Sequence, residues 1–450
     1  MTEHDSNGWG DADARTLFLS GRYSAFLDAV ETSDPRAMPP LTRLFAAKAL
    51  ARTNRAPEAI EILQSLSDPE TVGIELAAQA ALQQTVPSLV LGQDDNARAC
   101  IETAERLVAA SRSAELEAQL RLHQALMAWT KRDFATTEAL ARSAMSSDHA
   151  ETLALAGQFL GFVAAGRGRY MEQIAILESA LAELDTVRER DLWIEVSILQ
   201  NISGIINDLY LPAVARRMSD RAEAIEWPNE LSVQRHHILR ALAYSRSLGS
   251  DPFLPFEYLS RAAAFSPTDA WKLVSRLDRI FMIQEMSGDR IVKDFDVPAE
   301  LRYAEELTQT LDWREVDGEE RLALLLLAEI VADQRPKDAG RYLSLYRDLQ
   351  QTMSPLLMGK SDARVLANES FIEGIVVAAN GDTQRGIQLV GNAFEFWDDV
   401  GYSWRATRAA IKLYQLSGEE RHIEWAFRES RRYPYSWLSD AVSRAGHSKT

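Results

Sequence analysis

The sequence predicts an all-α protein, a solenoid of stacked helical hairpins with about eleven irregular repeats of roughly 40 residues. Three observations lead to this fold class. The chain of 450 residues contains only 22 Gly and 15 Pro, so few residues interrupt helices. Hydrophobic residues, 46% of the total, recur with helical spacing. A short turn of Gly, Asn or Asp, followed by an aromatic or small residue, recurs along the chain.

Six clear copies of this turn each lead into an apolar-periodic helix. They are Gly21-Arg22-Tyr23, Asn54-Arg55-Ala56, Arg132-Asp133-Phe134, Gly168-Arg169-Tyr170, Gly381-Asp382-Thr383 and Gly418-Glu419-Glu420. Weaker copies begin near Gln93, Asn207, Ser250, Gly288 and Gln334. The mean spacing of about 40 residues leaves room for two helices and two turns, so each repeat is predicted to be one helical hairpin.

Two of the copies carry a second glycine seven residues before the turn glycine. These are Gly161 before Gly168, and Gly374 before Gly381. A residue without a side chain lets two helix backbones approach closely. We therefore expect Gly161 and Gly374 to mark the points where the two helices of their hairpins cross.

These turns and small residues resemble those of the tetratricopeptide repeat (TPR) family, which implies a right-handed superhelix. The best matches are Gly161, Gly168, Tyr170, Leu177, Ala180, Gly374, Gly381, Asp382 and Ala393. The repeats here are longer than those of the family and mostly lack its closing proline. In this respect, and most clearly over residues 373–442, the chain resembles the MalT-like TPR solenoid of LuxR-type bacterial transcriptional regulators.

The resemblance implies a sensor solenoid without the helix-turn-helix domain of those regulators. Nucleic acid is therefore expected as a partner only through a missing or separate domain. Along the chain we expect a flexible acidic N-terminus over 1–15 and an N-terminal TPR-like solenoid over 16–290. A C-terminal solenoid over 291–438 continues the same superhelix, and a polar tail covers 439–450.

Composition excludes several classes of protein. The single cysteine, Cys100, excludes an intramolecular disulfide framework and is expected to be a buried small hydrophobe. The net charge of −17 argues against non-specific nucleic-acid binding by the whole chain. No apolar run approaches membrane-spanning length and no secretory leader is visible, so we expect a cytoplasmic protein without membrane contact. Metal-ligand and nucleophile motifs are absent from the sequence, which predicts no metal, no cofactor and no catalytic residue.

Candidate binding residues follow from the resemblance, since the first helix of each TPR hairpin lines the concave surface. On these helices the candidates are Gln158, Asn201, His237, Arg240 and Tyr244. The last unit adds Arg405, Arg408 and Lys412. Their spacing of i, i+3 and i+7 places these three on one helix face without an intervening acid. This stripe is either an ordinary solvated basic face or a surface for an anionic partner.

The predicted function is a non-enzymatic scaffold or sensor that binds a protein or peptide on its concave face, in bacterial signalling or transcriptional regulation. One alternative is a domain that senses a small-molecule effector in an enclosed pocket. A further alternative is an α/α enzyme with a central acidic cavity. The last 50 residues carry nine Lys and Arg against five acids, and such a basic end leaves open a homo-oligomer through another protomer's acidic flank.

Overall fold

The computed structural model describes residues 12–30, 38–206, 209–247, 253–285, 295–316, 320–351, 363–433 and 437–447. Within these ranges the regular elements are α-helices and the short 3-10 turn Asn229–Leu231, and no β-strand occurs. The predicted all-α class is therefore confirmed. None of the helices in these ranges combines the length and apolar character that crossing a bilayer requires.

The chain divides into two compact units. Unit 1 comprises the described residues of Met1–Ile198 together with Trp227–Leu231. Unit 2 comprises the described residues of Leu199–Glu226, Ser232–Met353 and Leu357–Thr450. The division falls within helix α12.

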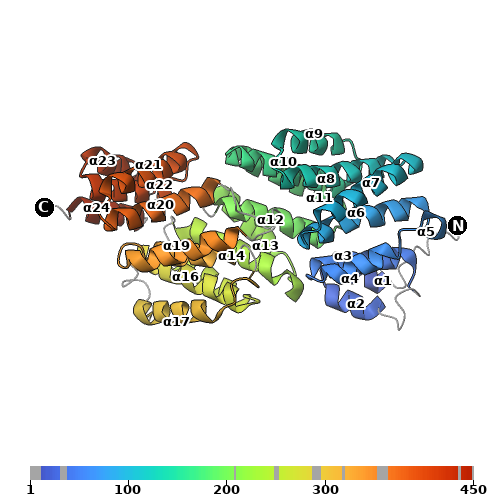
Figure 1. Ribbon diagram of the computed structural model, residues 1–450, viewed down its shortest axis with the longest axis horizontal. Coiled ribbons are helices and arrows are strands. Elements are labelled where there is room, and N and C mark those ends of the chain that lie inside the picture. The colour runs from blue at the N-terminus through green and yellow to red at the C-terminus, as the bar shows by residue number, and fades with distance from the viewer. Residues whose placement is uncertain are drawn as a thin grey trace. The chain divides into compact units, whose positions relative to one another are not determined.

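Unit 1 is a series of helices in which consecutive members pair, as α3 with α4, α6 with α7, α8 with α9 and α10 with α11 (Figure 1). Short turns join the partners, so the two helices of each pair run antiparallel. Its helices are α1 (Ala12–Leu19), α2 (Tyr23–Val30), α3 (Pro40–Arg52), α4 (Ala56–Gln64), α5 (Pro69–Val72), α6 (Ile74–Val90), α7 (Asp94–Ser111), α8 (Ala114–Thr130), α9 (Phe134–Ala144), α10 (Ala150–Gly166), α11 (Tyr170–Leu184) and the first part of α12 (Leu192–Ile206).

Unit 2 repeats this arrangement, with α14 packed on α15, α16 on α17, α18 on α19, α20 on α21 and α22 on α23. The successive hairpins predicted from the sequence are thus present in both units. After the end of α12, its helices are α13 (Pro212–Glu223), α14 (Ser232–Ser247), α15 (Leu254–Ala264), α16 (Asp269–Glu285), α17 (Val297–Thr310), α18 (Leu322–Val331), α19 (Pro336–Gln350), α20 (Ala363–Ala379), α21 (Thr383–Asp399), α22 (Ser403–Ser417), α23 (Glu420–Ser430) and α24 (Trp437–His447).

All six clear turns are found where the sequence predicts them. In each, one residue adopts the left-handed backbone conformation that ends a helix, with φ between 59° and 103°. These residues are Gly21, Asn54, Arg132, Gly168, Gly381 and Gly418. The next helix begins two residues later, and in two cases an aspartate caps it. Asp133 accepts a hydrogen bond from the Thr136 N–H at 3.0 Å, and Asp382 accepts one from the Arg385 N–H at 3.1 Å.

The weaker turn copies are only partly described. Gln93 directly precedes α7, and Gln334 lies just before α19, which begins at Pro336. Asn207, Ser250 and Gly288 lie outside the described residues. The number of repeats and the right-handed twist stay predictions.

The two glycines expected at helix crossings do lie at such crossings. A Cβ on Gly374 would stand 2.9 Å from the carbonyl oxygen of Gly386 on α21 and 2.7 Å from Cγ2 of Val390. A Cβ on Gly161 would stand 3.0 Å from Cδ2 of Leu177 on α11. The absence of a side chain therefore brings the helices together in both hairpins, against backbone in the first and against a side-chain tip in the second.

The predicted segments 1–15, 16–290, 291–438 and 439–450 stay predictions. Helix α1 covers residues 12–15, and α24 continues through 439–447, where Val442 is fully buried. Residues 1–11 and 448–450 lie outside the described part of the chain. Cys100 is buried as expected, and burial raises the pKa of its thiol.

Candidate functional site

Five of the eight candidate residues come together in unit 2. Arg240 and Tyr244 lie on α14, whereas Arg405, Arg408 and Lys412 lie on α22. They meet carboxylates carried by α16, by α18 and by the turn that follows α18. We call the set of four cations and four acids the charge cluster; its members are Arg240, Arg405, Arg408, Lys412, Asp278, Glu285, Glu329 and Asp333.

At one end of the charge cluster, α14 is joined to α16 through Asp278. The Arg240 guanidinium forms a bidentate ion pair with this carboxylate, in which Nη2 donates to Oδ1 at 3.0 Å. The hydroxyl of Tyr244 donates to the same Oδ1 at 2.6 Å. Asp278 is fully buried, so these donors replace the water that the carboxylate has lost.

The three cations of α22 pair with acids from earlier hairpins. Arg408 lies between two carboxylates, with Nη2 at 2.9 Å from Oε1 of Glu285 and Nη1 hydrogen-bonded to Oε1 of Glu329. Nη1 of Arg405 lies 3.7 Å from the same Glu329 oxygen. Lys412 pairs with Asp333, which follows α18.

These ion pairs change the description of the stripe that Arg405, Arg408 and Lys412 form on α22. The side chains of its three cations are only 13–16% exposed, so they form no solvated basic face. Each also has a carboxylate partner, so the stripe is not an uncompensated positive surface. The helix itself carries no acid between the cations, but the stacked hairpins bring acids to it.

Aromatic rings hold the guanidinium groups of α22 in place. Trp404 stacks on Tyr244 with ring centroids 6.3 Å apart, and the Arg405 guanidinium lies 4.6 Å from the centroid of a Trp404 ring. The Arg408 guanidinium lies 4.9 Å from the ring of Phe281. Cation–π contacts of this kind are worth more when desolvated, as they are here.

The environment shifts the pKa values of the acids in opposite directions. Burial raises the pKa of Glu285, although Arg408 partly opposes the shift. Burial also acts to raise the pKa of Glu329, but Arg408 and Arg405 together outweigh it and leave that pKa lowered. Burial and the neighbouring Asp278 raise the pKa of Tyr244, which stays a neutral phenol.

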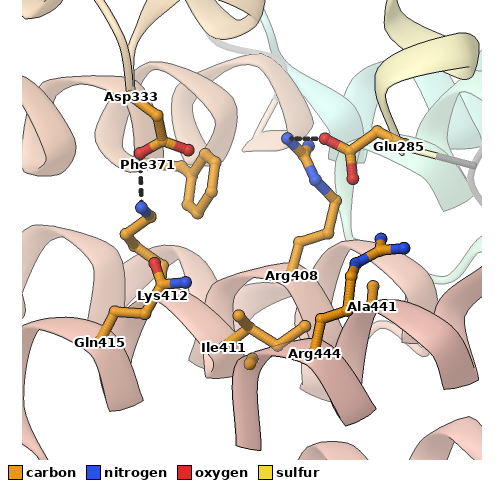
Figure 2. Close-up of a pocket in the computed structure, with 10 residues that line it drawn as sticks. Glu285, Asp333, Phe371, Arg408, Ile411, Lys412, Gln415, Ala441 and Arg444 are labelled. Atoms are coloured by element: carbon orange, nitrogen blue, oxygen red, sulfur yellow. Dashed lines mark hydrogen bonds and ion pairs between the residues drawn. The ribbon is translucent and has the colours of Figure 1, made fainter. Parts of the chain in front are cut away.

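A pocket of about 280 Å³ opens beside the ion pairs of Arg408 and Lys412. In Figure 2, Lys412 and Arg408 extend from α22, and Asp333 and Glu285 extend toward them from the side facing that helix. Ten residues of α16, α20, α22, α24 and the turn after α18 line it: Glu285, Asp333, Phe371, Arg408, Ile411, Lys412, Gln415, Ala441, Arg444 and Ala445. The lining of the pocket therefore includes charged groups of both signs together with apolar side chains.

The ion pair between Lys412 and Asp333 at the pocket edge is uneven, because its two side chains differ in exposure. The Asp333 side chain is 63% exposed, whereas its partner Lys412 is only 15% exposed. An exposed acid in such a pair gains little from it and returns easily to water. The arrangement therefore suits the exchange of one carboxylate for another at Lys412. In the described part of the chain, no group of three or more His, Cys, Asp or Glu is placed to hold a metal ion.

The other three candidates lie elsewhere. His237 packs edge-on against Trp271, with ring centroids 4.6 Å apart. Asn201 is half-buried on α12 in unit 2, and Gln158 is half-buried on α10 in unit 1. None of the three lines the pocket. Their binding role stays a prediction.

Sequence reasoning missed the acids of the charge cluster. Glu329 is the one charged residue in the apolar run Leu322–Ala332, whereas Asp278 on α16 lies between Arg276 and Arg279. A lone acid within an apolar helix signals a buried carboxylate that needs a partner. That signal was available for Glu329. Asp278 is flanked by arginines, and Glu285 and Asp333 lie at or just beyond helix ends, so none of these three is marked in the same way.

No family model matches the sequence, and no curated protein matches it significantly. Among solved structures, a chain in the crystal structure of the APC/C hetero-tetramer Cut9-Hcn1 is similar with 11% identity and a TM-score of 0.27, over 95% of this chain and 92% of that chain. Chains with so low a score superpose poorly. The TPR and MalT-like resemblances stay predictions from sequence.

Proposed function

We propose that the protein is a non-enzymatic helical-repeat scaffold whose pocket in unit 2 binds an acidic segment of a protein partner. The observation that carries the proposal is the uneven Lys412–Asp333 pair. A carboxylate of the partner replaces Asp333, which returns to water, and Lys412 keeps an anionic neighbour throughout. The buried cation is never left unpaired, so the exchange avoids the main penalty of breaking an ion pair.

The rest of the pocket fits a peptide with an apolar residue next to the acid. Phe371, Ile411 and Ala441 lie beside the charged groups. The pocket lining holds three cations against two acids, in a chain whose net charge is −17. The local excess of positive charge favours an anionic ligand over a cationic one.

A small-molecule effector is the second candidate, and the pocket volume favours it. The volume of about 280 Å³ is close to the lower end of the range for small-molecule sites. Such an effector would also need a carboxylate for Lys412. No specific observation favours the α/α enzyme with a central acidic cavity.

The biological setting is a further part of the proposal and rests on the sequence alone. The resemblance of residues 373–442 to the MalT-like solenoid supports a role in bacterial signalling or transcriptional regulation. It also supports a cytoplasmic location and a separate DNA-binding domain. A homo-oligomer would place the basic end of one protomer on the acidic flank of another.

Fluorescence polarisation with labelled ten-residue peptides tests the proposal. The probes carry Asp or Glu next to Leu or Phe, and matched probes carry Asn or Gln instead. We expect the full chain to bind the acidic probes. Lys412→Gln should weaken this binding about tenfold, the effect of losing one charge-assisted contact. Asp333→Asn should strengthen it, because the internal competitor is removed.

Lys272→Gln is the matched control, since Lys272 is exposed and pairs with Asp269 within α16. It should leave binding unchanged. Equal binding of acidic and amide probes, or unchanged affinity in Lys412→Gln, would contradict the proposal. Binding of none of the peptides would also contradict it and would leave the small-molecule candidate.

A further inference from the structure

Unit 1 contains a cluster of polar side chains that the proposed function does not use. Lys48 and Arg52 lie four residues apart on α3, on one face of the helix. Arg52 has a carboxylate partner: it donates to Asp191 through Nη1–Oδ1 at 3.0 Å and Nη2–Oδ2 at 2.6 Å. Its guanidinium also stacks 4.7 Å from the ring of Trp193.

Lys48 is not satisfied in this way. Within the described residues its ammonium has no ion pair and no hydrogen bond, and its one assigned contact is with the Phe45 ring, whose centroid lies 5.3 Å away. Burial, reinforced by the charge of Arg52, lowers the pKa of Lys48. A shielded cation without a carboxylate partner is costly for the fold, and an anion from outside would relieve that cost.

Glu151 on α10 presents the opposite charge nearby. Its Oε1 accepts a hydrogen bond from the Asp191 N–H at 3.2 Å. No cation of the described residues forms an ion pair with it. Burial and Asp191 raise the pKa of Glu151. Arg52, one turn after Lys48 on α3, binds Asp191, and the Asp191 N–H binds Glu151, so Lys48 and Glu151 lie on either side of one network. Among the described residues no ion pair joins the two.

His123 on α8 completes the group. Its Nδ1 is buried and has no hydrogen-bond partner among the described residues. Burial and the adjacent Lys48 lower the pKa of His123 to about 4, so the ring is neutral at physiological pH. It can therefore bond a ligand without adding charge to the site.

We propose that Lys48, Glu151 and His123 form a binding site for a small zwitterion, an α-amino acid with an apolar or aromatic side chain. Lys48 binds the carboxylate, Glu151 binds the ammonium group, and His123 hydrogen-bonds one of the two. The Phe45 ring, which lies 5.3 Å from the Lys48 ammonium, borders the ligand's side chain. A zwitterion satisfies the unpaired cation and the unpaired acid together, whereas a simple anion would meet only Lys48 and be repelled by Glu151.

Isothermal titration of the full chain with L-leucine and L-phenylalanine tests this site. We expect one or both to bind at concentrations up to about 10 mM and to raise the unfolding temperature. The amide derivatives lack the carboxylate, and the N-acetyl derivatives lack the ammonium group. Each derivative should bind about tenfold more weakly or not at all.

Two variants locate the site. Lys48→Met and Glu151→Gln should each weaken amino-acid binding about tenfold or more, and circular dichroism checks that they fold. Lys272→Met is the matched control and should bind normally. All three should bind the acidic peptides as wild type does, which separates this site from the pocket of unit 2.

Three outcomes would overturn the assignment. They are no binding of either amino acid, derivatives that bind as well as the parent compounds, and undiminished binding by a folded Lys48→Met variant.

Discussion

Each unit contains a buried arginine–aspartate pair with a tyrosine hydroxyl hydrogen-bonded to one of the two partners. In unit 1, Arg52 pairs with Asp191 and donates to the hydroxyl of Tyr23 at 2.9 Å. In unit 2, the same three residue types meet in the Arg240–Asp278–Tyr244 group. In both, the arginine lies on the first helix of a hairpin, and the acid is supplied by a later segment of the chain.

The units differ in what surrounds this pair. In unit 2 the neighbouring cations, Arg408 and Lys412, receive carboxylates from the chain itself. In unit 1 the neighbouring cation, Lys48, receives none from the described residues. Cations on the first helices of hairpins stabilise the fold where acids pair with them. Lys48, which has no such acid among the described residues, is the cation assigned above to the proposed amino-acid site.

The largest expected effect tests whether the shared pair supports the fold. Asp278→Ala leaves Arg240 buried without its carboxylate, and breaking such a pair costs about 3–5 kcal/mol in the free energy of unfolding. Asp191→Ala should cause a loss of similar size in unit 1. Urea denaturation followed by circular dichroism measures both.

Asp95→Ala is the control for these substitutions, because Asp95 is exposed and pairs with Arg98 one turn away. It should leave stability nearly unchanged. If Asp278→Ala behaved like Asp95→Ala, the buried pair would not support the fold and the comparison would lose its common element.

A smaller effect separates the helix crossings of the two units. Gly374→Ala places a methyl group against the Gly386 carbonyl oxygen, which cannot move freely, and should destabilise by about 1–3 kcal/mol. Gly161→Ala meets the flexible tip of Leu177 and should destabilise less. Thermal unfolding of the two variants compares them directly.

Gly391→Ala provides the control within the same hairpin, since a Cβ there would meet nothing within 4 Å. In the interior of α21 it should stabilise by about 0.5–1 kcal/mol. Equal losses for Gly161→Ala and Gly374→Ala would show that the nature of the contacted atoms does not matter.

Much of the fold was predictable because turn chemistry is local. The left-handed residues at Gly168 and Gly381, and the aspartate cap at Asp133, depend on neighbours within a few positions. The helix starts at Phe134 and Thr383 follow from them. The sequence therefore predicts hairpins well, whereas the number of repeats and their twist depend on stacking, which no local pattern specifies.

The candidate sites were only partly predictable. The spacing of Arg405, Arg408 and Lys412 correctly placed them on one helix face. Their acids could not be found in the same way, since Glu329 lies 79 residues before Arg408 and reaches it only through the stacking of hairpins. No sequence pattern marked Lys48, because its proposed role depends on its lack of an ion-pair partner among the described residues.

The most direct measurement compares the stability of two variants, Arg408→Met and Lys48→Met, by urea denaturation. Arg408→Met should lower the free energy of unfolding by about 3–5 kcal/mol, because it leaves Glu329 buried without its main cation. Lys48→Met should leave it unchanged or raise it, because Lys48 forms no ion pair with any residue that the structure describes. A loss in Lys48→Met as large as that in Arg408→Met would contradict the account.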